Sequence, residues 1–362
     1  MSEKHYDTIV IGSGPISILE AIHLKIQGKK VIIIDERDEI GGAWGTIKYE
    51  GFPELEIGCH IWDLAPGVFD FLQTVLGLEM KNMSPAPKIQ KGSKRFPYDW
   101  KMNMLTVKHS LKRSAQLKFR TLASDLKTPG YRLSILPPKY LYPINGAIDV
   151  KHALEDMLKK HDIPVLHTRL ARLDIDKRIT AQLSNSETIT ADQIALTSLS
   201  NIDEIRFNNQ VQAIDVKPVR YIHFHLVIKD PQPTNFSYVR VMGNQLIHRV
   251  SDMSRQAPDV LNKDEKLICV GIYEHEFDKH PANELGNLLF QQLQVLNFVS
   301  KNGSLRANHH NVFHAPYADK VAVRKIESES NGQLKFLHST NLTYGIHNQL
   351  PRWKDLLNTS TK

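Results

Sequence analysis

The clearest chemical pattern lies near the N-terminus, where Gly12-Ser13-Gly14-Pro15-Ile16-Ser17 fits G-x-G-x-x-(G/A/S). A glycine at the first position permits a tight turn from a strand into a helix. A glycine at the second has no Cβ, so a ligand can approach the backbone closely. The N–H groups and positive end of the following helix then favour a phosphate or pyrophosphate. Ser17 replaces the usual third glycine and is small enough for the close packing of helix on strand that this position needs.

The flanking residues predict the elements that must hold this turn. Residues 6–11 form a short apolar run, which is typical of a buried parallel strand, and Pro15 suits the first turn of a helix. Apolar residues then recur at helical spacing as far as Gly28, and residues 31–34 form a second apolar run. A strand, a turn, a helix and a strand within about 30 residues indicate a βαβ unit with a right-handed crossover.

A carboxylate, Asp35, ends the second predicted strand. An acid about 20 residues beyond the glycine turn binds the ribose hydroxyls of a dinucleotide, and its charge disfavours a ribose 2′-phosphate. We therefore expect Gly12, Gly14, Pro15 and Ser17 to surround a pyrophosphate. An α/β unit that binds no nucleotide is the alternative interpretation.

The residues that follow narrow the expected cofactor. Residues 35–44, DERDEIGGAW, resemble the acid-x-R-x-x-h-G-G signature of the flavin amine oxidase superfamily, which includes protoporphyrinogen oxidases, phytoene desaturases and UDP-galactopyranose mutases. The resemblance implies FAD as the cofactor, with the glycine pair close to its pyrophosphate and ribityl chain and the arginine beside its adenosine. The residues that it implies as cofactor contacts are Asp35, Glu36, Arg37, Gly41, Gly42, Ala43 and Trp44.

Shorter segments continue the resemblance. Residues 56–60, EIGCH, are similar to the G-x-H segment that passes near the flavin ring, which makes His60 a candidate catalytic residue. Residues 247–251, IHRVS, are similar to part of the substrate domain and make Arg249 the second candidate. The strand around Leu170 corresponds to the one that presents a backbone group to adenine. The alternative roles are loop packing for His60 and a surface salt bridge for Arg249.

The C-terminal segment departs from the family pattern. The family has a strand ending in glycine and an acid, whose carboxylate contacts the ribityl chain, whereas residues 336–348, FLHSTNLTYGIHN, have no acid after the glycine. We expect Thr340 or Asn341 to take the ribityl contact, and Gly345 and Ile346 to pass beneath the isoalloxazine ring.

The expected fold class is α/β, with a Rossmann-type FAD-binding domain and an inserted substrate domain made of an antiparallel sheet and helices. The expected FAD-binding domain comprises residues 1–80, 142–205 and 333–362, and the substrate domain comprises residues 81–141 and 206–332. Residues 219–228 and 237–250 alternate as antiparallel strands do. Helices are predicted over residues 68–76, 149–160, 283–299 and near 351–357.

The composition is that of a globular protein. The 362 residues are 41% hydrophobic and 23% charged, which argues against disordered and fibrous classes. No apolar run approaches the roughly 18 residues of a membrane span, and residues 1–7 do not resemble a signal peptide. The two cysteines, Cys59 and Cys269, cannot form a disulfide framework, so we expect a cytoplasmic setting.

The net charge of +7 includes basic stretches at residues 91–95 and 108–120. The first interpretation of these stretches is that they form a solvent-exposed surface. The second is that their positive electrostatic field attracts an anionic substrate. No nucleic-acid motif accompanies the charge. Histidines cluster at residues 274–280 and 309–314. Positions in strands and in a surface loop account for these histidines, so we predict no metal site.

The resemblance implies an FAD-dependent oxidoreductase that dehydrogenates a small organic substrate by hydride transfer to the flavin. A second G-x-G-x-x-G is absent from the sequence, so electrons should come from the substrate or an external donor rather than from a nicotinamide domain. A reduced-flavin-dependent nucleotide-sugar isomerase resembling UDP-galactopyranose mutase is one alternative, and a non-catalytic flavoprotein is another. The sequence leaves the substrate, the electron acceptor and the oligomeric state open.

Overall fold

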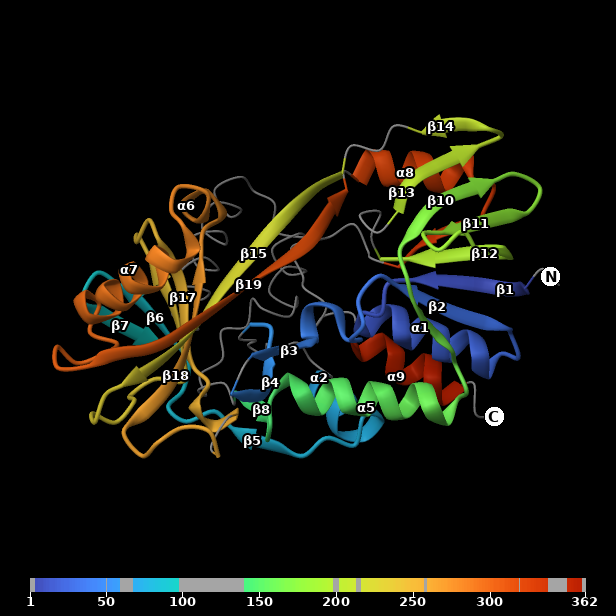
Figure 1. Cartoon of the computed structure of the whole chain (residues 1–362). Helices are drawn as coiled ribbons and strands as arrows, with labels where there is room; N and C mark the ends of the chain where they lie inside the picture. The colour runs from blue at the N-terminus through green and yellow to red at the C-terminus, as the bar shows by residue number, and fades with distance from the viewer. Residues whose placement is uncertain are drawn as a thin grey trace, which may run out of the picture.

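The structure, a computed structural model, describes residues 4–49, 51–58, 68–97, 140–197, 202–212, 216–256, 259–318, 320–337 and 350–359. Its main strands form two sheets, one of nine strands and one of seven (Figure 1). Two long strands of the second sheet, β15 (Val216–Lys229) and β19 (Ser304–Ala318), pair along their length and extend toward the first sheet (Figure 1). The predicted architecture of a Rossmann-type unit with an additional antiparallel sheet is confirmed.

The predicted βαβ unit is present toward one edge of the first sheet, with one further strand, β9, beyond it. It consists of β1 (Lys4–Ile11), α1 (Pro15–Ile26) and β2 (Val31–Asp35), and every residue of β2 is buried. The two strands are parallel, with Thr8 opposite Val31 and Ile11 opposite Ile34. On the other side of β1 lies β12 (Thr188–Leu196), which is also parallel to it. The strand and helix ends therefore agree with the prediction from apolar periodicity.

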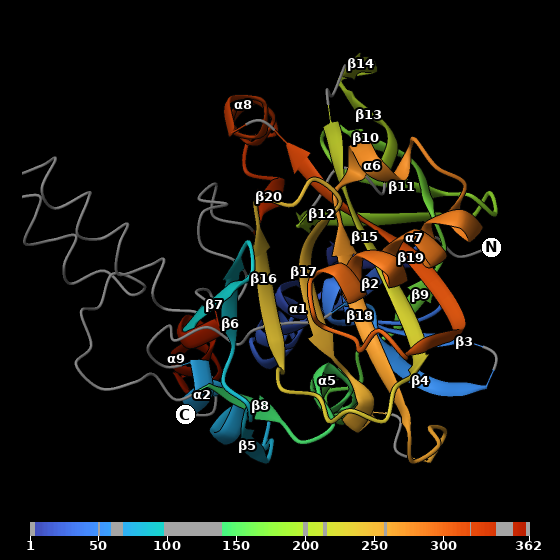
Figure 2. The same cartoon turned by 90° about the vertical axis from the view of Figure 1, so that its left-hand side faces the viewer.

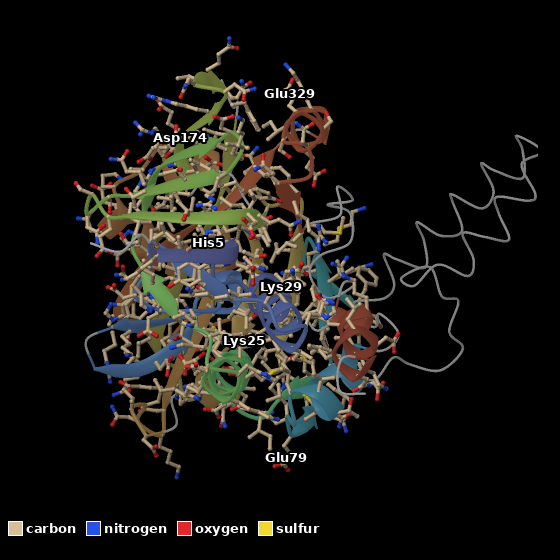
Figure 3. All side chains as sticks on the ribbon, turned by 90° about the vertical axis from the view of Figure 1, so that its right-hand side faces the viewer. His5, Lys25, Lys29, Glu79, Asp174 and Glu329 are labelled. Atoms are coloured by element: carbon tan, nitrogen blue, oxygen red, sulfur yellow. The ribbon has the colours of Figure 1, made fainter. Side chains whose placement is uncertain are left out.

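The rest of the first sheet extends in both directions from this unit. Its order is β14-β13-β10-β11-β12-β1-β2-β9, and β20 also pairs with β12. The bounds are β9 (Val165–His167), β10 (Leu170–Ile175), β11 (Ile179–Leu183), β13 (Ile202–Phe207), β14 (Gln210–Gln212) and β20 (Leu334–Phe336). In Figure 3, His5 marks β1 and Asp174 marks β10 of this sheet, while Lys25 lies near the end of α1.

Helices cover one face of this sheet. Helix α1 packs against α5 (Ala147–Lys160) and α9 (Leu350–Thr359), and the shared core includes Leu19, Ile22, Leu154 and Trp353. Helices α5 and α9 lie beside α1 below the sheet in Figure 1. The helix expected at residues 68–76 is divided between α2 (Val68–Asp70) and a π-helical turn, η2 (Phe71–Val75), which also packs on α9.

The second sheet is antiparallel except for the pairing of β16 with β6, and its order is β19-β15-β18-β17-β16-β6-β7. Its remaining strands are β6 (Lys88–Lys91), β7 (Lys94–Pro97), β16 (Tyr238–Met242), β17 (Ile247–Asp252) and β18 (Glu265–Ile272). One face packs against α7 (Ala282–Val295) through leucines and phenylalanines, and Figure 2 shows this helix in front of the sheet. The other face meets the hairpin of β3 (Thr46–Tyr49) and β4 (Phe52–Glu56).

Three sequence predictions need correction. Residues 237–250 form two strands instead of one, because the chain turns at Gly243, where φ is +76°. The short helix α6 (Glu274–Phe277) replaces the strand and loop expected for the 274–280 histidines. Helix α7 ends at Val295 and not at 299, because Asn297 has a φ of +58°. The first sheet continues through β14, and the expected division into domains stays a prediction.

The remaining elements are short or terminal. They are β5 (Met80–Asn82), which pairs with β8 (Leu141–Pro143), the 3-10 turns η1 (Gly42–Trp44) and η3 (Ser254–Gln256), and α8 (Lys320–Glu329). Among the residues that the structure describes, no helix is long and apolar enough to cross a membrane. The same residues contain no group of three or more His, Cys, Asp or Glu side chains that could hold a metal ion.

Candidate functional site

The glycine turn after β1 has the geometry that its sequence requires. Gly12 has a φ of +88°, a left-handed conformation that glycine adopts without steric cost, and its N–H donates to the Ile34 carbonyl oxygen over 2.8 Å. A Cβ added to Gly14 would meet no described heavy atom within 4 Å, so this side of the turn is open. Helix α1 starts directly at Pro15, and no described side chain caps its first turn. The turn therefore presents an open helix N-terminus, which favours an anion.

Ser17 has the packing role expected of the third glycine position. Its side chain is buried in the first turn of α1, and its Oγ lies 3.4 Å from Oγ1 of Thr197, just beyond β12. Serine is thus small enough to let α1 lie against the sheet.

The Asp35 carboxylate joins the glycine turn to the loop after β2. It is 1% exposed and accepts hydrogen bonds from the Ser13 N–H and Oγ at 2.6 Å each, and from the Arg37 N–H at 2.9 Å. The Arg37 guanidinium also pairs with it at 3.2 Å. Burial alone would raise the pKa of Asp35, but the hydrogen bonds and charge of Arg37 and the hydrogen bond from Ser13 hold this pKa below its ordinary value. The carboxylate is therefore ionised at neutral pH.

The glycine pair of the second motif packs directly on the first motif. Gly41 and Gly42 have φ values of +108° and +59°, and the Gly41 N–H donates to the Ser13 carbonyl oxygen over 2.9 Å. A Cβ on Gly42 would lie only 2.9 Å from the Gly14 Cα. A Cβ on Gly41 would be equally close to the Gly45 Cα. Only glycine permits this backbone contact, which brings two motifs nearly 30 residues apart into one groove.

Arg37 and Trp44 hold the ends of this loop. Nη1 of Arg37 donates to the Gly42 carbonyl oxygen over 3.3 Å, while the Trp44 ring is 2% exposed and belongs to the core beneath α1. Ala43, between them, is exposed. The loop is thus fixed from both the solvent side and the core side.

The segment before β10 lies beside Asp35, as expected for the strand that faces adenine. The Thr168 N–H donates to the Asp35 carbonyl oxygen over 2.8 Å, and Nδ1 of His167 lies 2.5 Å from the Arg37 carbonyl oxygen. Leu170 begins β10 and is 1% exposed. The contact between its backbone and adenine stays a prediction.

Glu36, next to Asp35, belongs to an exposed ion-pair network. Its carboxylate lies 2.8 Å from Nη1 of Arg169, which also pairs with Asp203. An arginine held by two carboxylates beside the expected adenosine end was not anticipated from the sequence, because its partners are 133 and 34 residues away from it.

A buried lysine ties the glycine loop to α5. Lys151, whose side chain is 4% exposed, lies 2.5 Å from a Glu39 oxygen, 2.7 Å from a Glu54 oxygen and 3.2 Å from the Thr46 hydroxyl. Glu39 lies two residues before Gly41, and Glu54 belongs to β4. The lysine therefore fixes the loop and the β3–β4 hairpin to the same helix.

Arg249 lies on the face of the second sheet that turns toward the first domain. It is opposite Gly271 of β18, which is in turn opposite His223 of β15, and its Nη2 contacts Nε2 of His223. A Cβ on Gly58 would lie 2.6 Å from Cε1 of His223, so this ring packs on the chain two residues before His60. The structure thus brings Arg249 close to the G-x-H segment.

Five of the predicted site residues lie outside the described residues. These are His60, Thr340, Asn341, Gly345 and Ile346. Their roles at the flavin end stay predictions from the resemblance.

A second histidine on the same face, His225, is buried among neutral partners. Its Nδ1 lies 3.1 Å from the Tyr49 hydroxyl and its Nε2 lies 3.1 Å from the Glu56 carbonyl oxygen. His309 stacks on Tyr49 with ring centroids 4.5 Å apart, and Nδ2 of Asn311 donates to the Ile57 carbonyl oxygen over 2.8 Å. These contacts fix the β3–β4 hairpin, and with it the start of the G-x-H segment, to the second sheet.

Glu56 is a buried carboxylate that the sequence analysis did not single out. It is 0% exposed and accepts hydrogen bonds from the Tyr142 hydroxyl at 2.7 and 2.8 Å and from the Ala147 N–H at 2.6 Å. The Ala147 N–H belongs to the first turn of α5, where a carboxylate is favoured by the helix dipole. The only sequence signal was an acid two residues before a glycine, which is too weak to predict this role.

A cavity of about 120 Å³ adjoins Glu56 between the short strands β4, β5 and β8 and the edge of the second sheet. Glu56 and Tyr142 line one side of it, and Tyr238, Ser251 and Arg255 line the other. Ser251 lies two residues from Arg249 on β17, so the cavity is beside the strand that carries this arginine.

We expect acid to weaken the fold through His225. Burial is the main cause that lowers the pKa of His225 from 6.5 to about 4. A histidine with a lowered pKa in the folded state is stabilising above its unfolded pKa, and this contribution is lost as the pH falls from 6.5 toward 4. At about 1.4 kcal/mol per pKa unit, the loss is roughly 3 kcal/mol.

Urea unfolding at a series of pH values measures this effect. His225→Gln should flatten the slope of the unfolding free energy between pH 6.5 and 4. An unchanged slope in His225→Gln would show that another group carries the acid sensitivity.

Comparisons with known proteins agree with this geometry. The family model described as an NAD(P)-binding Rossmann-like domain matches residues 10–75, which contain both glycine motifs and Asp35. An all-trans-retinol 13,14-reductase from Danio rerio is 39% identical over 54 residues, covering 15% of this chain and 9% of the relative. A soluble pyridine nucleotide transhydrogenase from Marinobacter nauticus is 30% identical over 98 residues, covering 22% and 21%. The chain thus spans less than a quarter of the length of these curated relatives.

Solved structures match over nearly the whole chain. Reduced UDP-galactopyranose mutase aligns with a TM-score of 0.70 and 13% identity, covering 100% of this chain and 95% of that one. Putrescine oxidase bound to putrescine aligns with a TM-score of 0.66 and 13% identity, covering 99% of each chain. A putative protoporphyrinogen oxidase from Exiguobacterium sp. 255-15 gives 0.65 and 12%, covering 100% and 99%.

The fold and the glycine-lined groove define a two-sheet α/β protein with a Rossmann-like nucleotide-binding unit. Within that class, the fold of the chain is similar to that of the solved mutase and oxidase structures. The resemblance drawn from residues 35–44 is confirmed at the level of the fold.

Proposed function

We propose that this protein is an FAD-dependent oxidoreductase. The observation that carries the proposal is the backbone contact between Gly14 and Gly42 beside the ionised Asp35, because it leaves an open groove at a helix N-terminus with a carboxylate at one end. A pyrophosphate fits the N–H groups of that helix, and ribose hydroxyls fit the carboxylate. The residues are therefore suited to hold FAD.

The proposed cofactor contacts follow the groove. They are Gly12, Gly14, Pro15, Ser17, Asp35, Glu36, Arg37, Gly41, Gly42, Ala43, Trp44 and Leu170, and, outside the described residues, Thr340, Asn341, Gly345 and Ile346. The first sheet with its helices would form the FAD-binding domain and the second sheet with α7 the substrate domain. A cytoplasmic setting with a small-molecule substrate completes the proposal.

The proposed reaction is the dehydrogenation of a small organic substrate, which the oxidases among the solved neighbours support. Bound FAD would supply a two-electron acceptor, while the chain places the substrate and excludes water. Arg249 would orient the substrate by charge and hydrogen bonding, and the ring of His223 would hold Arg249 in place. His60 is the candidate proton acceptor or donor at the same face.

A reduced-flavin-dependent isomerase acting on a nucleotide sugar is the second candidate. The alignment with reduced UDP-galactopyranose mutase over the whole chain favours it. The two candidates differ in electron flow. Rapid-mixing spectroscopy with primary amines and with UDP-sugars would distinguish them. Bleaching of an oxidised flavin by a substrate supports the oxidoreductase. Turnover that needs prior reduction and consumes no oxygen supports the isomerase.

We expect Arg249→Gln and His60→Asn each to keep the flavin and lower turnover at least about tenfold, because a charge-assisted hydrogen bond contributes about 1.5–3 kcal/mol. The rate of flavin reduction under single-turnover conditions, with flavin content measured on the same sample, provides the test. Arg178→Gln, in the turn between β10 and β11, removes an arginine far from the second sheet and should retain full activity. Full turnover in Arg249→Gln or in His60→Asn would remove that residue from the mechanism.

A further inference from the structure

The cavity beside Glu56 contains two buried hydroxyl groups that have no partner. Ser251 of β17 is 3% exposed and lies directly opposite Tyr238 of β16, so both side chains share the face of the sheet that lines the cavity. Within the part of the chain that the structure describes, the Ser251 Oγ forms no hydrogen bond, and the same holds for the Oγ of Ser237 in the same cavity. Because a buried hydroxyl without a partner destabilises a fold, these two groups favour a ligand with a polar atom.

Two cationic side chains line the same cavity. Lys81 of β5 lies opposite Tyr142 of β8, and Arg255 belongs to η3 and is exposed. Nζ of Lys81 donates to the Ile144 carbonyl oxygen, and Nη2 of Arg255 donates to the Ser84 carbonyl oxygen over 3.0 Å. Over the described ranges neither cation forms an ion pair, so both charges are met only by neutral carbonyl oxygens.

The two cations are close enough to repel each other. Burial is the first cause that lowers the pKa of the Lys81 ammonium below its ordinary value, and the positive charge of Arg255 is the second. The carboxylate of Asp149 acts on this pKa in the opposite direction, and its effect is the smallest of the three. An anion between the ammonium and the guanidinium would relieve their repulsion.

The two carboxylates that line the cavity already accept hydrogen bonds from neighbouring groups. Glu56 accepts from the Tyr142 hydroxyl and from the Ala147 N–H, as described above. Asp252 accepts from the Ser254 N–H over 3.0 Å and from the Ser254 Oγ over 2.5 Å. Lys81 and Arg255 are therefore the charged groups of the cavity that most favour a ligand of opposite charge.

The size and the apolar walls of the cavity limit the ligand further. Met83 and Met253 line it and belong to the same apolar cluster. Its volume of about 120 Å³ is somewhat less than the roughly 150 Å³ that holds one benzene molecule, which suits a short aliphatic chain. We propose that the cavity binds a short hydroxy acid, with its carboxylate at Lys81 and Arg255 and its hydroxyl at Ser251. Among the described residues that line the cavity, none belongs to the glycine-lined groove, so this site does not rest on the proposed function.

Calorimetric titration of the purified full chain with 4-hydroxybutyrate, butyrate and 1-butanol tests the site, because the last two probes each lack one polar group. Wild type should bind 4-hydroxybutyrate most tightly. Arg255→Gln should bind 4-hydroxybutyrate at least about tenfold more weakly, since a charge-assisted contact is lost, and should bind 1-butanol as wild type does. Ser251→Ala should lose the preference for 4-hydroxybutyrate over butyrate. Arg178→Gln removes an arginine far from the cavity and is the matched control, which should bind as wild type does.

Thermal unfolding of the same samples separates binding from folding. Without a probe, Arg255→Gln should unfold at the temperature of wild type, because Arg255 is exposed. With 4-hydroxybutyrate, wild type and Arg178→Gln should gain stability, and Arg255→Gln should gain less. Equal affinity of Arg255→Gln and wild type for 4-hydroxybutyrate would overturn the proposal, as would the absence of binding in wild type.

The visible spectrum of the flavin-loaded protein distinguishes two sources of such an acid, and either result supports the site. A shift of the flavin bands when 4-hydroxybutyrate binds would indicate a substrate that lies beside the flavin. Unchanged bands, with binding measured on the same sample, would indicate a ligand that is held apart from the reaction.

Discussion

Replacing Gly42 by alanine should leave a folded protein that no longer retains FAD. The new Cβ would be placed 2.9 Å from the Gly14 Cα, and backbone on both sides leaves no flexible atom to yield. The two loops would have to separate, and the pyrophosphate groove between them would widen. An error of about 1 Å in a positioned site costs on the order of a hundredfold, so we expect FAD affinity to fall by at least that factor. Equilibrium dialysis against FAD provides the measurement.

Gly92→Ala is the matched control for this substitution. Gly92 has a φ of +60°, almost the same as the +59° of Gly42, but a Cβ there would meet no described atom within 4 Å. Both variants place an alanine in a left-handed conformation, which lowers the stability of the fold by about 1 kcal/mol. Only Gly42→Ala adds the clash with Gly14. Equal FAD affinity in the two variants would show that the contact between Gly14 and Gly42 does not shape the site.

Asp35→Asn should weaken both the fold and FAD binding. The Asp35 carboxylate accepts hydrogen bonds from the Ser13 N–H, the Ser13 hydroxyl and the Arg37 N–H, and an amide cannot accept all of them. Each buried donor left without an acceptor destabilises the fold by roughly 1–3 kcal/mol. We expect a loss of about that size in the free energy of unfolding and a loss of FAD affinity that is larger still. Asp38→Asn, at an exposed position in the same loop, should change neither quantity.

The pH dependence of this variant has a defined sign. The folded-state pKa of Asp35 lies below its ordinary value of 3.8, so the carboxylate stabilises the fold above about pH 4, and this contribution is lost as the pH falls through the folded pKa. Urea unfolding below pH 4 should therefore show a steeper loss of stability in wild type than in Asp35→Asn. Parallel curves for the two proteins would mean that Asp35 is not the group responsible.

Local features of the site could be predicted from the sequence because they depend on short-range spacing. The turn at Gly12, the helix start at Pro15 and the acid at Asp35 follow from the pattern of one βαβ unit. The glycine pair was expected from the resemblance of residues 35–44 to the family signature. Their φ values of +108° and +59° are ones that other residue types rarely adopt.

Contacts between distant segments could not be predicted in this way. Arg240 and Arg249 lie opposite each other because the chain turns at Gly243 and begins a second strand. In one continuous strand the two arginines would lie nine residues apart along the same strand. The bond between Glu56 and the first turn of α5 joins residues 91 positions apart. Nothing in the periodicity of either segment encodes such a partner.

Purification of the protein and identification of its chromophore test the central claim most directly. We expect a yellow protein with the visible absorption bands of oxidised flavin, which releases FAD on denaturation and regains it on refolding with added FAD. A colourless protein that cannot be reconstituted with FAD would contradict the account and leave the glycine-lined groove without its proposed cofactor.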